Sequence, residues 1–108
     1  MTGLVQVSTT TDSQESATTL ARSAVELRLA ASAQIYGPVA SVFWHLGELD
    51  AGEEWQVLLR TTEDRYPQLE AHLLKQHPWD NPEVTAVALT ASSPRYGEWV
   101  RRATTEPE

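Results

Sequence analysis

Apolar and polar residues alternate with two different periods along this chain, and the changes of period predict strands and helices in turn. Residues 4–10 are rich in β-branched side chains, which favours a strand. Alanines and leucines then recur on one face at helical spacing as far as about Ala31, which predicts a helix. Asp12 can cap this helix, with Glu15 three positions later as in a capping box.

Two segments rich in β-branched and aromatic residues follow and predict strands, namely residues 33–46 and 54–61. Residues 47–52 between them combine glycine with polar side chains and predict a turn, so the two strands should form an antiparallel hairpin. Residues 29–47 contain no charged side chain and approach the length of a membrane span. Their valine, isoleucine and aromatic content instead predicts buried β structure and not a membrane helix.

The last third of the chain predicts a helix, a strand and a short final helix. Pro67 is tolerated only in the first turn of a helix, which places the start of the first of these near residues 64–65. Residues 84–90 predict a strand, and residues 94–103 predict the final helix. The polar tail, residues 104–108, is expected to be frayed.

The predicted order is therefore βαββαβ followed by a small helix. This order is typical of the ferredoxin-like α+β fold, in which two helices cover one face of a four-stranded antiparallel sheet. The other face is left bare, and the strands hold more apolar side chains than two helices can cover. Six of these side chains need a further cover: Val42, Trp44, Trp55, Val57, Val87 and Leu89. A neighbouring subunit would bury them, so association between copies is expected.

Length and composition limit the possible functions. The 108 residues and 12.0 kDa fit a single domain spanning residues 1–108, with a core from about 4 to 103. A net charge of −7 with only eight Lys and Arg argues against nucleic acid and against an anionic membrane surface as partners. The absence of Cys excludes disulfides and thiolate metal sites within the chain. No basic segment followed by an apolar run is present at the N-terminus, so no secretory signal is evident and the cytoplasm is the expected location.

The densest group of chemically useful side chains lies between His77 and Glu83, a segment called the connector below. It joins the predicted second helix to the last strand and contains an imidazole, an indole, two carboxylates and two prolines. Each proline restricts its own φ and pushes the preceding residue toward extended backbone, which predicts a stiff link. Such a link suits a binding site and equally suits a plain helix-to-strand loop.

Each side chain of the connector allows two interpretations. His77 can hold a divalent cation together with a carboxylate of the connector or of another subunit, or it can cap the helix C-terminus and bond nearby backbone. Trp79 can line a ligand pocket or anchor the core or an interface.

The chain has no nucleophile elbow, HExxH motif or glycine-rich phosphate loop, so it is not expected to be an enzyme.

The connector belongs to a wider pattern that runs from about Leu4 to Arg101. The other parts of the pattern are residues 20–22 and 26–31, residues 38–44, Gly47 with Glu53 and Glu54, Arg60 with Thr61, and Tyr96 with Trp99. Together these segments resemble the CutA family of divalent-cation tolerance proteins. Residues 77–84, His-Pro-Trp-Asp-Asn-Pro-Glu-Val, are similar to the most distinctive motif of that family, His-Pro-Tyr-Glu-x-Pro-Glu-Ile.

The resemblance implies a ferredoxin-like subunit in a tight homotrimer, with a role in tolerance to copper and other divalent cations. On this hypothesis a cleft between subunits binds a small ligand through Trp79, Glu83 and Arg60, or a metal ion through His77. No cofactor is obligatory, and a divalent cation, copper or another, is one candidate ligand. Ser32 stands where many members have Cys, and a hydroxyl is a poorer ligand for copper than a thiolate. Two alternatives stay open: a trimer that senses a small metabolite, and a structural trimer that serves as a scaffold.

Overall fold

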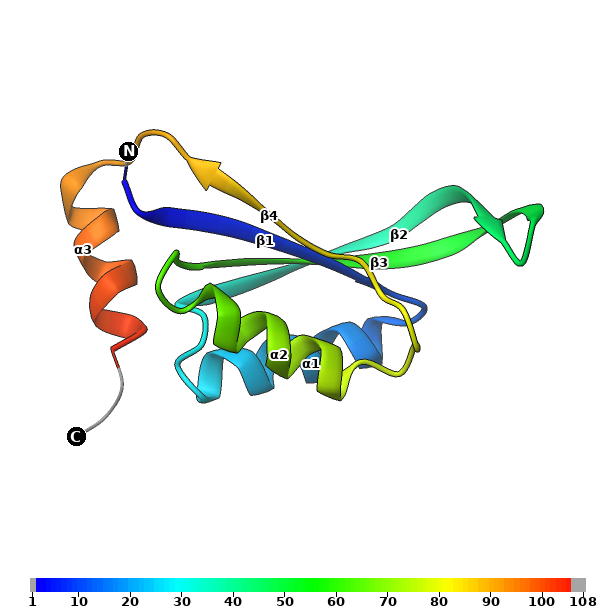
Figure 1. The fold of residues 1–108 in the computed structure, drawn as a ribbon, viewed down its shortest axis with the longest axis horizontal. Coiled ribbons are helices and arrows are strands. Elements are labelled where there is room, and N and C mark those ends of the chain that lie inside the picture. The colour runs from blue at the N-terminus through cyan, green and yellow to red at the C-terminus, as the bar shows by residue number, and fades with distance from the viewer. Residues whose placement is uncertain (1, 106–108) are drawn as a thin grey trace.

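Four strands and three helices follow one another in the order that the sequence predicts (Figure 1). The computed structural model describes residues 2–105. The elements are β1 (Leu4–Thr11), α1 (Gln14–Glu26), β2 (Ser32–His45), β3 (Glu48–Thr62), α2 (Tyr66–Gln76), β4 (Val84–Leu89) and α3 (Pro94–Ala103). The strands form one antiparallel sheet in the order β2-β3-β1-β4, so the ferredoxin-like α+β fold is confirmed.

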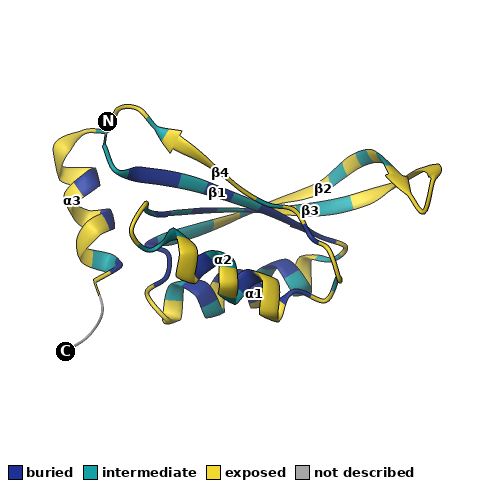
Figure 2. Ribbon diagram, in the orientation of Figure 1, coloured by how far each residue is buried: buried dark blue, intermediate teal, exposed yellow. Residues whose placement is uncertain are grey.

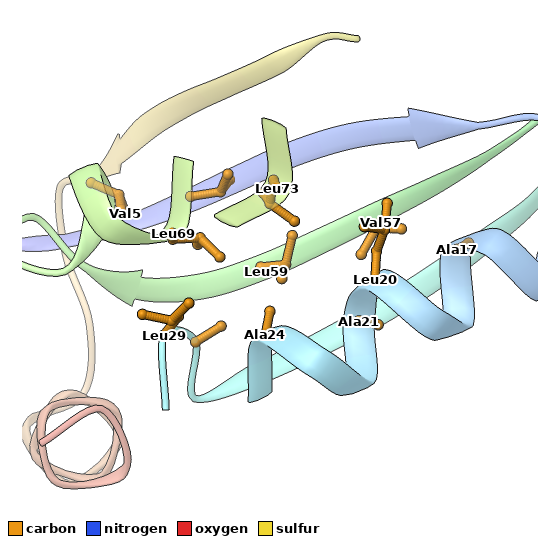
Figure 3. Packing of buried hydrophobic residues seen from close by; sticks show 12 residues of the cluster. Val5, Ala17, Leu20, Ala21, Ala24, Leu29, Val57, Leu59, Leu69 and Leu73 are labelled. Atoms are coloured by element: carbon orange, nitrogen blue, oxygen red, sulfur yellow. The ribbon is translucent and has the colours of Figure 1, made fainter. Parts of the chain in front are cut away.

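The main core lies between the sheet and the two helices α1 and α2, which cover the same face (Figure 3). Odd-numbered residues of β1 and β3 point to these helices because side chains alternate along a strand. Fully buried side chains of this core include Val7, Val57 and Leu59 from the strands and Leu69 and Leu73 from α2. Burial of each such leucine contributes about 1.5–3 kcal/mol to folding. We call the opposite side of the sheet the open face.

The last helix, α3, covers one end of the open face. Val100 packs there against Leu4 of β1 and Ala31, and all three are buried. Thr104 is also buried, and its hydroxyl donates to the carbonyl of Val100 at 2.8 Å. The expectation that the tail frays from Thr104 onward is therefore wrong at this residue, and residues 106–108 lie outside the described part of the chain.

Both ends of α1 differ from the prediction. The N-cap is Ser13 and not Asp12, because the Ser13 hydroxyl accepts a hydrogen bond from the amide of Ser16 at 3.1 Å. The helix ends at Glu26, five residues earlier than expected. Arg28 adopts a positive φ of 58°, and this left-handed residue turns the chain back toward the sheet. Residues 29–31 come after the helix and are apolar because they are buried in the core. Their apolar character made the helical pattern look longer than the helix is.

The β2–β3 hairpin is longer than predicted, because its turn consists of Leu46 and Gly47 alone. Both have positive φ, 52° and 80°, as in the two-residue turns that suit the twist of a hairpin. His45 therefore pairs directly with Glu48, and the residues expected to form a turn, 48–52, belong to β3. We call residues 40–53 the hairpin arm; the arm extends past the helices at one end of the molecule (Figure 1).

No residue of the hairpin arm is buried, whereas β1 and the part of β3 beneath the helices contain buried residues (Figure 2). Val42 and Trp44 are 71% and 75% exposed, and Leu49, which pairs with Trp44, is 67% exposed. The prediction of β structure here is confirmed, but burial is not found in the single chain. The expectation that Val57 needs a further cover is also wrong, because α1 and α2 already bury it completely.

Candidate functional site

The connector leaves α2 at the end of the sheet where β1 stops and β4 begins. His77 is the C-cap of α2: its backbone amide donates to the carbonyl of Leu73 at 2.9 Å, and its backbone is extended, with ψ of 138°. Pro78 explains this geometry, because a proline pushes the residue before it out of the α region. The helix therefore stops at the residue that carries the imidazole.

The imidazole of His77 is buried and makes two hydrogen bonds. Nδ1 accepts from the backbone amide of Trp79 at 3.0 Å, and Nε2 lies 2.7 Å from the carbonyl oxygen of Thr10. The Trp79 amide only donates, so Nδ1 carries no proton in this arrangement, and a carbonyl only accepts, so Nε2 carries the ring proton. This bond ties the connector to the end of β1, 67 residues earlier in the sequence.

The remaining side chains of the connector divide into an inner and an outer group. Trp79 is half-buried, with its ring centroid 5.1 Å from that of His77 and a tilt of 52°, and Pro82 is buried. Asp80 and Glu83 are exposed, and a Glu83 oxygen accepts a hydrogen bond from the Thr85 hydroxyl at 2.8 Å. The connector thus brings His77 and Trp79 together and leaves its carboxylates at the surface.

Histidines and carboxylates do not converge on a metal centre in the described part of the chain. Among residues 2–105, no three side chains of His, Asp or Glu are grouped as metal ligands. His45 lies at the end of the hairpin arm, and His72 lies between the helices with Nε2 2.9 Å from the Ser23 hydroxyl. Metal binding by His77 stays a prediction, and in this conformation it requires one of the two hydrogen bonds of the ring to break.

The environment of His72 favours its neutral form. Partial burial lowers the pKa of His72 below its ordinary value, and the nearby charge of Lys75 lowers it further. The Ser23 hydroxyl donates to the Leu20 carbonyl at 3.0 Å, so the hydroxyl oxygen is left to accept from Nε2 of His72. This arrangement links α1 to α2 and does not activate the serine as a nucleophile.

Arg60 does not join the connector within one chain. It lies on the open face of β3 opposite Gln6, whereas the carbonyl that His77 contacts belongs to Thr10, four positions along β1 and about 13 Å away. The guanidinium bonds Gln6 and Gln34. Arg60 can reach a connector only in another copy of the chain.

Two hollows flank α1. A groove of about 460 Å³ lies between α1 and β2, with Ala21, Val25 and Ile35 among its lining residues. A smaller hollow of about 230 Å³ lies between α1 and the end of α2, and of the connector only Pro78 lines it. Neither is lined by Trp79 or Glu83.

Comparison with known proteins gives this geometry a context. The family model described as CutA1 divalent ion tolerance protein matches residues 5–103. The chain belongs to this family. The resemblance seen in the sequence is therefore confirmed.

The "Divalent-cation tolerance protein CutA" of Thermus thermophilus is 33% identical over 95 residues, which cover 88% of this chain and 92% of that protein. The solved structure of a CutA from Synechococcus elongatus has a TM-score of 0.92 at 31% identity and covers 97% of this chain and 93% of its own. A rice protein named "Protein CutA 1, chloroplastic" is 29% identical, and the aligned part is 58% of its length. Fold and family therefore agree along the whole core.

The names of the relatives also bear on where the protein is located. No helix within residues 2–105 is both long and apolar enough to cross a membrane. The rice relative and an Arabidopsis relative are named as chloroplastic, so a cytoplasmic location stays a prediction.

Proposed function

We propose that this CutA1-family protein acts in tolerance to divalent cations as a cytoplasmic, non-catalytic homotrimer. The observation that carries the proposal is the apolar side of the hairpin arm. Val42, Trp44 and Leu49 lie on the side of the sheet that α1 and α2 cover in the body, yet all three are more than 65% exposed. Large contiguous apolar patches on a soluble chain mark interaction surfaces.

The sheet edges support the same assembly. In the order β2-β3-β1-β4 both outer strands, β2 and β4, have one edge without a partner strand among residues 2–105. Unequal edges that pair head to tail close into a ring when the rotation between copies allows it. The resemblance to CutA proteins implies a ring of three.

Light scattering tests this assembly directly. A trimer of a 12.0 kDa chain has a mass of about 36 kDa at micromolar concentration. A measured mass of about 12 kDa would contradict the proposal, and with it the cleft between subunits.

The cation site of the proposal is the connector, where His77 supplies a nitrogen ligand and Asp80 or Glu83 supplies oxygen ligands. Imidazole and carboxylate groups suit borderline and hard divalent cations, whereas the lack of Cys disfavours soft copper(I). For a small ligand in place of a cation, Trp79 and Glu83 line the cleft between subunits, and Arg60 joins them from another copy.

Calorimetric titration with Cu²⁺, Zn²⁺ and Ni²⁺ tests the cation site. The wild-type protein should bind at least one of these ions, and His77→Gln should weaken that binding by about tenfold or more, since one coordinating nitrogen is lost. Gln keeps a donor for the Thr10 carbonyl, so the fold is preserved. His45→Gln is the matched control, because His45 is exposed at the far end of the hairpin arm. Absence of binding, or equal binding by the two variants, would rule out His77 as the ligand.

A small metabolite is the second candidate ligand, because the half-buried indole of Trp79 offers an aromatic surface beside polar groups. Thermal shift measurements against a panel of metabolites separate the two candidates. Stabilisation by a metabolite in the presence of a chelator supports this second function, and stabilisation by metal ions alone supports the first.

A further inference from the structure

The open face of the sheet carries a hydrogen-bond network centred on Arg60. Nη2 of Arg60 donates to Oε1 of Gln6 at 2.9 Å, and Nη1 donates to Oε1 of Gln34 at 3.3 Å. The hydroxyl of Tyr36 donates to the same Gln34 oxygen at 3.2 Å. The network crosses the three adjacent strands β2, β3 and β1.

The guanidinium fixes the orientation of both amides. Arginine has five N–H donors and no acceptor, so each glutamine turns its oxygen toward Arg60 and its NH₂ group away from it. Within residues 2–105 neither of the two NH₂ groups has a hydrogen-bond partner. Within residues 2–105 the network therefore leaves N–H donors of Gln6, Gln34 and Arg60 available to a ligand.

The charge of Arg60 is not balanced by its surroundings. Both partners are neutral amides, and β1, β2 and β4 contain no acidic residue. The nearest acidic residue on the same face of β3 is Glu54, six positions and about 20 Å away. Arg60 makes no ion pair within residues 2–105, so its charge is open to an external anion.

We propose that Arg60, with the amide nitrogens of Gln6 and Gln34, forms a binding site for an oxyanion, either a carboxylate or a phosphate group. Arginine binds both through parallel N–H···O bonds, and the two amides add neutral donors on either side. The site lies on the open face, and its ligand has the opposite charge to a cation held by the connector. It goes beyond the proposed function and stands or falls independently of cation binding.

The oxyanion comes either from solution or from an acidic side chain of a second copy whose surface meets the open face. Both sources present the same chemistry to Arg60. The two sources differ in the effect of removing Arg60. If the oxyanion is free in solution, only ligand binding changes; if it is a carboxylate of another copy, the assembly is weakened.

Titration with inorganic phosphate, followed by calorimetry on the full-length protein, tests the site. Saturable binding should weaken about tenfold or more in Arg60→Gln, because hydrogen bonds to a charged group are lost. Arg95→Gln removes the same charge from an exposed position on α3 and should change the affinity less than about twofold. Gln34→Leu keeps the charge of Arg60, changes only an exposed side chain, and should give an intermediate loss.

Light scattering on the same variants distinguishes the two sources. If a second copy supplies the carboxylate, phosphate does not bind the wild-type assembly, and Arg60→Gln lowers the mass while Arg95→Gln does not. The proposal is overturned if Arg60→Gln and Arg95→Gln bind phosphate equally well, or if phosphate does not bind and Arg60→Gln leaves the mass unchanged.

Discussion

The same two strands, β2 and β3, run through two regions of the molecule that differ in their cover. In the body, Leu59 of β3 is fully buried beneath α1 and α2. In the hairpin arm, Leu49 lies on the same side of the same strand and is 67% exposed. Apolar residues recur on this side of β3 in both regions, interrupted only by Glu53. The alternation therefore predicts which side is apolar but not what covers it.

The difference in cover separates the stability of the folded protomer from the stability of its association with other copies. Contacts of the body lie within one chain and should determine the free energy of unfolding of the protomer. The large apolar side chains Val42, Trp44 and Leu49 of the hairpin arm are mostly exposed in the single chain, so changes there should act on association between copies. Substitutions in the two regions should therefore differ in whether they change unfolding or association.

Leu59→Ala should have the largest effect on the body. Leu59 has no exposed surface and packs between the sheet and both helices (Figure 3), so its truncation should lower the free energy of unfolding by about 2–5 kcal/mol. Urea denaturation at several protein concentrations measures this loss. Leu49→Ala is the matched control and should change chiefly the concentration dependence of the transition. An equal loss for both variants at the lowest concentration would contradict the separation.

Trp44→Ser should have the next largest effect, and only on association. The indole is 75% exposed in the single chain, and a tryptophan at the centre of an interface commonly contributes about 2 kcal/mol or more. The mass from light scattering should fall toward 12.0 kDa while the circular dichroism of the protomer stays the same. His45→Ser changes the neighbouring residue on the other side of the arm and should leave the mass unaltered. An unchanged mass for Trp44→Ser would show that the arm is not an interface.

The order of elements could be predicted because each depends on local periodicity, and local periodicity is visible in one sequence. Element ends depend on single residues. Arg28 follows the end of α1 and Leu46 lies in the hairpin turn, and both have the left-handed backbone that usually occurs at glycine. Neither residue type predicts such a turn from the sequence. Sequence patterns therefore gave α1 too many residues and β3 too few.

The candidate site shows the same division. The stiffness of the connector and the capping role of His77 follow from Pro78, its immediate neighbour. The carbonyl that binds Nε2 belongs to Thr10, and the amides around Arg60 belong to Gln6 and Gln34. These partners lie 26 to 67 residues away in the sequence, so local patterns do not identify them.

Gly37→Ala should disturb the junction between the body and the arm. A Cβ at this position would lie 2.4 Å from Cε3 of the Trp55 ring, so the ring or the strand must move. Overpacking of this kind costs about 1–3 kcal/mol, and thermal unfolding should show the loss as a lower Tm. Gly52→Ala is the control, because nothing lies within 4 Å of its added Cβ. Equal Tm values for the two variants would mean that Gly37 is not required by packing.

Ser13→Ala should give the smallest effect, and it decides which residue caps α1. The Ser13 hydroxyl accepts the hydrogen bond of the Ser16 amide, whereas Asp12 is exposed and lies one position too early. Loss of a cap side chain costs about 1 kcal/mol, so Ser13→Ala should lower the free energy of unfolding by that amount. Urea denaturation should show this as a lower midpoint with an unchanged slope. Asp12→Ala should cost only a few tenths of a kcal/mol, since an exposed carboxylate near a helix N-terminus acts only through the helix dipole. A larger loss for Asp12→Ala than for Ser13→Ala would restore the cap that the sequence predicts, and would move the start of α1 one residue toward β1.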